Sequence, residues 1–79
     1  MIVEVAETSL NYDRDLKVPL YARAGIPEVW LIDLPGEEIW AYSQPEGGAY
    51  RTANRISRGG SITSGTVPGL TVKADEILG

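Results

Sequence analysis

The sequence of 79 residues contains no cysteine and no histidine. The absence of cysteine excludes disulfide bonds and thiolate nucleophiles, and the absence of both residue types excludes zinc sites built from thiolates and imidazoles. Every catalytic triad that depends on histidine is excluded as well. If this protein catalyses a reaction, carboxylates and lysines must carry the chemistry.

Basic residues are also scarce, because 7 Lys and Arg stand against 11 Asp and Glu, for a formal net charge of −4. Nonspecific affinity for nucleic acid is largely electrostatic, so this balance argues against a surface that coats phosphate backbones. Arg51, Arg55 and Arg58 lie close together in the sequence, and we interpret them as a solvated strand face. No residue is assigned to nucleic-acid binding on this basis.

Long apolar runs are missing too. No stretch approaches the ~20 apolar residues that span a bilayer, and the first residues lack the basic region and long apolar core of a signal peptide. The sequence therefore predicts a cytoplasmic protein without a membrane partner.

A chain of this length forms one domain, residues 1–79, around one core. Residues 2–6 and 28–34 carry apolar side chains on both faces, which is typical of central strands. The first of these strands includes one carboxylate, Glu4, where a charge is costly. A strand that begins at residue 2 and is apolar on both faces needs a neighbour on each side. We therefore expect a homodimer, or a second chain that completes the sheet.

The stretch between these strands, up to Ala24, is predicted as the main helix. Its candidate N-terminal caps are Thr8, Ser9, Asn11 and Asp13, and Gly25 and Pro27 end it. An apolar stripe at four-residue spacing is formed by Leu16, Leu20 and Ala24. Pro19 predicts either a kink or a helix that starts late enough for the proline to lie in its first turn.

The second half of the chain predicts a β-meander. Residues 39–43 and about 49–57 form strands after the turns "PGEE" and "QPEGG", the stretches "SITS" and "LTV" form short strands, and "ADEIL" adds a helical turn. The order β-α-β followed by a meander indicates an α/β or an α+β fold, with a mixed sheet and one main helix.

Three stretches carry a resemblance to a known family. They are "IVEVAETS", "YDRDLKVPLYARAGIPEVWLIDL" and "IWAYSQPEGGAYR". Together they resemble the C-terminal half of the Uma-type family of restriction-endonuclease-like proteins, in the PD-(D/E)XK superfamily. The resemblance runs from residue 2 to about residue 72 and is densest in residues 2–33. It implies a partial restriction-endonuclease-like core and magnesium-dependent hydrolysis of DNA.

The resemblance also implies roles for individual residues. Glu4 matches the second metal-binding acid, the backbone carbonyl of Val5 is a further Mg²⁺ ligand, and Lys17 matches the catalytic lysine. The residues alone leave another interpretation open, in which Glu4 is neutralised by Lys17, Arg14 or Arg23 in a structural ion pair. Tyr12 and Tyr21 are interpreted as packing and capping residues, and Asp33 as a structural residue.

The first metal-binding Asp of the family would precede Ile2, where only Met1 stands, and Glu7 points to the face opposite Glu4 if the strand continues. One carboxylate and one carbonyl make a weak magnesium site. The expectation is therefore a truncated relative of these nucleases that is inactive alone. Two alternatives remain: an active nuclease whose missing acid comes from another chain, and a non-catalytic interaction or regulatory module.

Overall fold

The computed structural model describes residues 1–8 and 10–79. Of the predicted helix caps, Ser9 lies outside the described residues, as does the side chain of Asp13. The elements in chain order are β1 (Ile2–Ala6), α1 (Leu10–Tyr12), a π-helical segment η1 (Asp13–Lys17), α2 (Val18–Arg23), β2 (Glu28–Asp33), β3 (Glu38–Glu46), β4 (Ala49–Ser57), β5 (Ser61–Thr63), β6 (Thr71–Lys73) and α3 (Ala74–Leu78).

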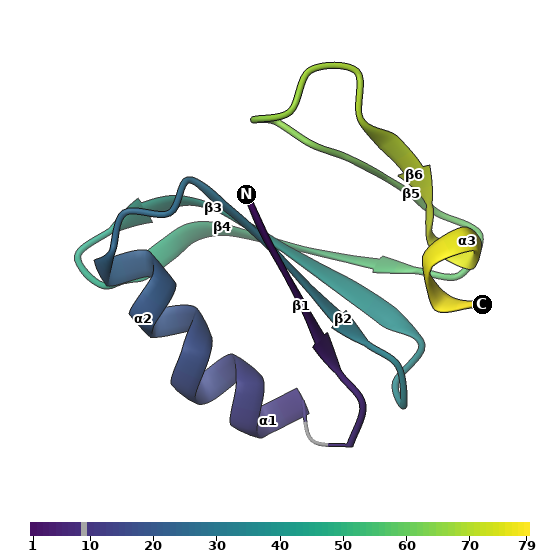
Figure 1. Cartoon of the computed structure of the whole chain (residues 1–79), viewed down its shortest axis with the longest axis horizontal. Coiled ribbons are helices and arrows are strands. Elements are labelled where there is room, and N and C mark those ends of the chain that lie inside the picture. Colours follow the sequence, from purple (N-terminus) through teal and green to yellow (C-terminus); the bar gives the residue numbers. More distant parts are fainter. Residues whose placement is uncertain (9) are drawn as a thin grey trace.

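The first four strands form one mixed sheet in the order β1-β2-β3-β4, and β5 and β6 form a separate two-stranded sheet. β1 and β2 are parallel, because the helical segment between them returns the chain to the same end of the sheet. The pairs β2–β3 and β3–β4 are antiparallel. This arrangement confirms the predicted mixed sheet and the β-α-β order followed by a meander (Figure 1).

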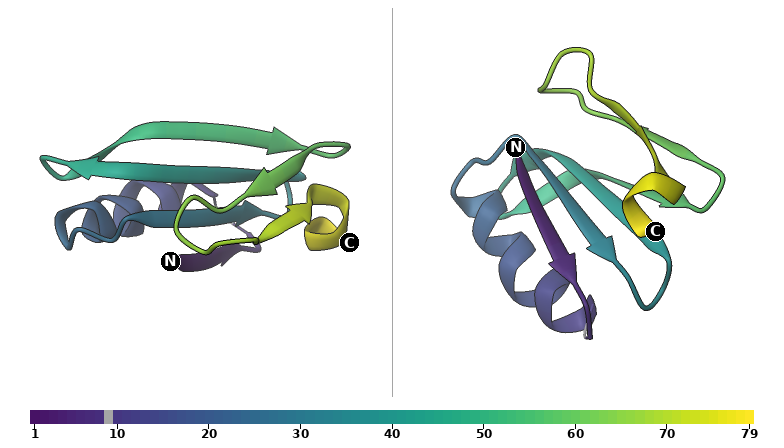
Figure 2. Two further views of the ribbon diagram at one scale, coloured as in Figure 1. Left: turned by 90° about the horizontal axis from the view of Figure 1, so that it is seen from above. Right: turned by 45° about the vertical axis from the view of Figure 1, so that its right-hand side comes forward.

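The four-stranded sheet is covered on both faces. The helical segment α1-η1-α2 lies on one side, and β5, β6 and α3 lie on the other (Figures 1 and 2). All six residues of β2 are buried, as expected for a strand with a neighbour on each side and a layer over each face. The second covering layer was not predicted, because three-residue strands carry too little periodicity to identify the surface on which they pack.

The helical segment changes its winding just before Pro19. The π-helical turns of η1 end at Lys17, and α2 begins at Val18, so that Pro19 lies in its first turn. Within α2 this agrees with the second alternative for the proline, but the helical segment as a whole begins at Leu10 and continues through η1. The change of winding directly before Pro19 is the kind of local adjustment found where a proline removes a hydrogen bond from a helix.

The predicted apolar stripe of the helix was wrong. Leu16 and Leu20 are 49% and 51% exposed, whereas Val18 and Ala22 are buried against the sheet. Leu16, Leu20 and Ala24 are all exposed, so the four-residue spacing did place them on one side of the helix. That side faces away from the sheet, and the spacing alone did not identify which side packs on it.

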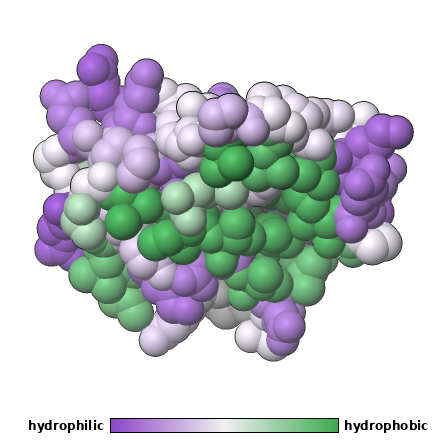
Figure 3. All heavy atoms as spheres, turned by 45° about the horizontal axis from the view of Figure 1, so that its top comes forward, coloured by the Kyte–Doolittle hydropathy of each residue, from purple (hydrophilic) through white to green (hydrophobic). Residues whose placement is uncertain are grey.

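The prediction that β1 is a central strand was also wrong for this chain. β1 lies at the edge of the four-stranded sheet, where Val3 and Val5 are each 48% exposed. Their in-register neighbours on β2, Trp30 and Ile32, are buried on the same face. In the view of Figure 3, hydrophobic side chains gather into a broad area bordered by hydrophilic ones. The pattern of residues 2–6 correctly indicated two apolar faces but not a neighbour on both sides.

The hairpin between β3 and β4 is longer than predicted. β3 continues through Glu46, which pairs with Ala49, so the turn consists of Gly47 and Gly48 alone. Both glycines have positive φ, 62° and 83°, as a two-residue hairpin turn of type I′ requires.

Candidate metal and catalytic site

Glu4 and Lys17, which the sequence proposed as catalytic residues, meet in the structure. The side chain of Glu4 points from β1 toward the helical layer and is 22% exposed. Lys17 is the last residue of η1, and its Nζ lies 3.3 Å from Oε2 of Glu4. The carboxylate in the apolar leading strand is thus half-buried and paired with a cation from a different element.

Tyr21 contributes a second contact to the same carboxylate. Its hydroxyl donates a hydrogen bond to Oε1 of Glu4, and its ring packs against the core cluster that contains Val18 and Leu31. The interpretation of Tyr21 as a packing residue accounts for the ring but not for the hydroxyl. The four-residue spacing of Lys17 and Tyr21 places both side chains on one side of a helix, but it does not identify the carboxylate that they meet.

The Val5 carbonyl lies at the open edge of the sheet. The Leu34 N–H donates to the Ala6 carbonyl at 3.1 Å, so the Ala6 carbonyl points toward β2. Because successive carbonyls of a strand point in opposite directions, that of Val5 points away from β2, to the side where β1 has no partner strand among the described residues. A carboxylate and a carbonyl are oxygen ligands of the kind that Mg²⁺ takes.

The number of acidic ligands is nevertheless small. Among the described side chains, which do not include that of Asp13, no group of three or more Asp, Glu, His or Cys residues is placed to hold a metal ion. Glu7 is exposed and follows the last residue of β1. The site therefore has ligands of the type that magnesium takes, but the described side chains do not complete a metal-binding group there.

Two other charged residues, Arg14 and Asp33, have hydrogen-bond partners of their own. Arg14, one of the cations considered for Glu4, lies 3.3 Å from Asp15 and donates to Asn11 at 2.9 Å. Asp33, at the end of β2, accepts a hydrogen bond from the Gly36 N–H at 3.0 Å, which stabilises the turn into β3. This contact agrees with the structural role expected for Asp33.

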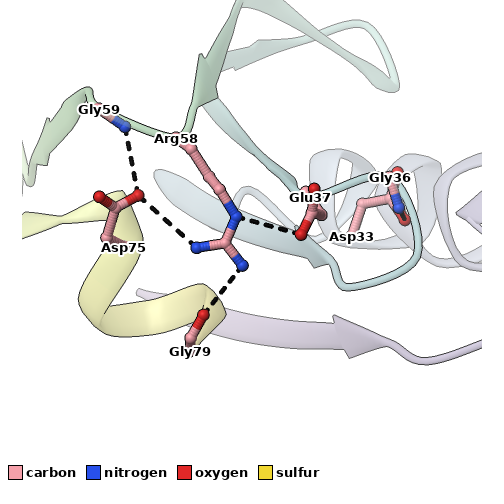
Figure 4. A network of polar contacts seen from close by, with 7 residues as sticks. All are labelled: Asp33, Gly36, Glu37, Arg58, Gly59, Asp75 and Gly79. Carbon is pink, nitrogen blue, oxygen red and sulfur yellow. Dashed lines mark hydrogen bonds and ion pairs between the residues drawn. The ribbon is translucent and has the colours of Figure 1, made fainter.

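The three arginines of the second half each lie beside a carboxylate. Arg51 is 3.2 Å from Glu46, and Arg55 is 3.7 Å from Glu38. Arg58 has three polar contacts: it lies 3.1 Å from Glu37 and 3.7 Å from Asp75, and it donates to the carbonyl of Gly79 at 2.9 Å (Figure 4). The Arg58 contacts tie α3 to the turn that precedes β3.

A second polar cluster, which the sequence reasoning missed, surrounds Glu28 on the opposite face of the sheet. The buried carboxylate accepts hydrogen bonds from Ser64 at 2.5 Å, Thr66 at 2.6 Å, the Gly65 N–H at 3.1 Å and the Trp30 indole at 3.2 Å. Burial raises the pKa of Glu28, but these hydrogen bonds outweigh it and lower the pKa from 4.5 to about 2. The four donors thus hold Glu28 in its ionised form.

A hollow of about 470 Å³ lies beside this cluster, with Glu28, Ser43, Asn54 and Thr66 among its lining residues. It lies on the face covered by β5 and β6, away from Glu4. Three of the four donors, Ser64, Gly65 and Thr66, lie in the segment after β5. Their hydrogen bonds to Glu28 attach that segment to β2. We therefore interpret the Glu28 cluster as structural.

Comparison with known proteins bears on the Glu4 site. A family model, Uma2, described as "Putative restriction endonuclease", matches residues 1–75. The chain belongs to the Uma2 family. This confirms the resemblance inferred from the sequence and extends it over nearly the whole chain. No curated protein and no solved structure matches the chain.

Membership in the Uma2 family gives the pairing of Glu4 and Lys17 a chemical context, because the family is nuclease-like.

One further finding concerns the membrane. Among the described helices, none is long and apolar enough to cross a bilayer.

Proposed function

We propose that this chain supplies the glutamate and lysine of a Mg²⁺-dependent phosphodiesterase site that acts on DNA in the cytoplasm, and that it is inactive alone. The observation that carries the proposal is the 3.3 Å contact between Lys17 Nζ and Glu4 Oε2, which joins residues of two separate elements. Both residues match positions to which the family resemblance gave catalytic roles.

The roles of the residues follow from their chemistry. Glu4 and the Val5 carbonyl would hold the Mg²⁺ ion. A bound Mg²⁺ stabilises negative charge on a phosphate and favours the ionised form of an attacking water. Lys17 places a positive charge beside the carboxylate, where it can orient a water or a phosphate oxygen.

The proposed inactivity has two reasons. Magnesium loses its water ligands reluctantly and is held in most enzymes by more than one anionic group, whereas the described side chains form no group of three or more acidic ligands. The net charge of −4 and the carboxylate partners of Arg51, Arg55 and Arg58 also make the isolated chain a poor electrostatic match for DNA. A second copy of this chain carries the same negative charge and the same arginine partners, so we propose that a dimer of the chain is inactive as well.

The open edge of β1 is the surface on which we place a partner strand. β1 pairs only with β2 among the described strands, and its half-exposed Val3 and Val5 extend the apolar row of Trp30 and Ile32 outward. Unpaired edges with apolar side chains favour strand addition. A second copy of this chain is the partner that we propose.

Light scattering tests this pairing. The wild-type chain at micromolar concentration is expected to have twice the mass of the 8.5 kDa monomer. Val5→Lys places a charge on the edge and is expected to give the monomer mass. Leu20→Lys is the matched control, because Leu20 is exposed to a similar degree on α2 and its change should leave the dimer intact. A monomeric wild type, or a dimer dissociated by Leu20→Lys alone, would contradict the proposal.

Nicking of supercoiled plasmid DNA tests the catalytic part. With Mg²⁺, the purified chain is expected to produce no nicked circles above the background of the EDTA control, and Glu4→Ala is expected to change nothing in this assay. Magnesium-dependent nicking that is lost in both Glu4→Ala and Lys17→Ala would show instead that the chain forms a complete site. The missing acid would then come from a symmetry-related copy.

A further inference from the structure

The hydrogen bonds of Glu28 are structural, but they leave its negative charge without a balancing cation. The carboxylate is only 5% exposed. Its contacts are neutral donors: the hydroxyls of Ser64 and Thr66, the Gly65 N–H and the Trp30 indole. No lysine or arginine among the described residues lies within ion-pair distance of it. Because buried charges in proteins are usually paired, this one favours a positive group nearby.

The hollow of about 470 Å³ beside Glu28 has room for such a group. Ser43 lies opposite Glu28 in the sheet, and Asn54 lies opposite Ala41, so these side chains share one face. Neither Ser43 nor Asn54 has a side-chain hydrogen-bond partner among the described residues. Thr66 donates to Glu28 and keeps an acceptor site on its own oxygen. The described lining therefore supplies oxygen acceptors and no basic residue.

We propose that this hollow binds a primary ammonium ion, the charged end of an aliphatic amine. The ammonium group has three N–H donors for the hydroxyl and amide oxygens of the lining, and Glu28 supplies the opposite charge. Three apolar lining residues, Pro27, Ala41 and Pro45, contact the methylene chain of the amine. The proposal does not involve Glu4 and is independent of the proposed function.

Other cations fit the hollow less well. A guanidinium binds a carboxylate through two parallel hydrogen bonds, but four donors already occupy the two oxygens of Glu28. A quaternary ammonium ion binds to aromatic faces. The ring of Tyr42, which is among the lining residues, belongs to the core cluster with Val18 on the other face of the sheet. A divalent metal ion takes several oxygen ligands directly, and the described side chains form no acidic group for one.

Titration with butylammonium, followed through the amide signals of Ser43, Asn54 and Gly65 in NMR spectra, tests the proposal. 1-Butanol is the neutral control ligand, because it has the same chain without the charge. Butylammonium is expected to shift these signals to saturation, and butanol at the same concentrations is not. Signals that do not respond to butylammonium, or that respond equally to butanol, would overturn the proposal.

Glu28→Gln removes the charge and keeps a hydrogen-bonding side chain, and it is expected to weaken butylammonium binding about tenfold or more. Asp15→Asn is the matched control, because it removes an equal charge from an exposed residue of η1, on the other face of the sheet. Its affinity should stay within about threefold of the wild type. Equal affinities of the two variants would contradict the role given to Glu28.

Asn54→Lys provides a second test that leaves the Glu28 cluster intact. It places a cation at the hollow and is expected to weaken binding about tenfold, with little change in melting temperature because Asn54 is exposed. Ala53→Lys adds the same charge to an exposed neighbour that lies opposite Tyr42 and points to the other face. Equal weakening by both variants would overturn the assignment of the hollow.

The source of the ammonium group is distinguished by a second ligand. N-acetyl-lysine amide carries the same butylammonium group on a peptide unit. If it binds more tightly than butylammonium, the group belongs to a lysine of a polypeptide, and if it binds less tightly, the group belongs to a free amine. Either result supports the proposal, and the absence of binding by both ligands would overturn it.

Discussion

Replacement of Leu31 by alanine is expected to lower the free energy of unfolding by about 3 to 5 kcal/mol. Leu31 lies at the centre of β2, is 0% exposed and belongs to the core cluster with Val18 and Tyr42. Truncation removes buried methyl groups and leaves a cavity that a sheet covered on both faces cannot close. A domain of this length has a total stability of roughly 4 to 12 kcal/mol, so the loss is a large share of it.

Urea denaturation followed by tryptophan fluorescence measures this loss. Leu34→Ala is the matched control, because Leu34 follows β2 directly but is exposed, and its change should cost less than about 1 kcal/mol. If Leu31→Ala were no more destabilising than Leu34→Ala, the central position of β2 would be wrong.

Replacement of Glu28 by alanine is expected to cost about 3 to 4 kcal/mol. The change leaves two hydroxyls, one backbone N–H and one indole N–H without their common acceptor, and an unsatisfied buried polar group costs about 1 to 3 kcal/mol. Glu28→Gln should cost about half as much. Its amide oxygen can accept from Trp30 and Gly65, while its NH₂ group can donate to the hydroxyls of Ser64 and Thr66.

A matched surface substitution distinguishes the loss of the Glu28 hydrogen bonds from the loss of one negative charge. Glu46→Ala removes an exposed carboxylate that pairs with Arg51, and it should cost less than about 1 kcal/mol. A loss in Glu28→Ala no greater than that in Glu46→Ala would contradict the interpretation that Glu28 fastens the segment after β5.

The low pKa of Glu28 also predicts how stability depends on pH. Because the folded-state pKa is about 2 and the ordinary value is 4.5, the folded state holds its proton less tightly than the unfolded state does. The stabilisation is therefore complete above pH 4.5 and is lost as the pH falls from there through 2. The difference corresponds to about 3 kcal/mol. In urea titrations at a series of pH values, the wild type should lose stability over this range more steeply than Glu28→Gln.

The candidate site was predicted in part. The residues alone allowed two interpretations of Glu4, as a metal ligand or as one member of a structural ion pair. The family resemblance assigned a catalytic role to Lys17. The structure brings these two residues together. It also adds Tyr21, whose hydroxyl contact spans 17 positions of the sequence, and the Glu28 cluster, whose bond to Ser64 spans 36. No local pattern of spacing identifies which donor meets a carboxylate over such separations.

The sequence by itself determined the local elements: the buried strand β2, the presence of a hairpin between β3 and β4, the helical segment and the short C-terminal helix. These depend on periodicity and turn residues, which act over a few positions. Only the tertiary structure decided that β1 lies at the edge, that β5, β6 and α3 cover the second face, and that Val18 and Ala22 rather than Leu16 and Leu20 face the sheet. Those outcomes depend on how much apolar surface each pairing of distant segments buries, which no single segment specifies.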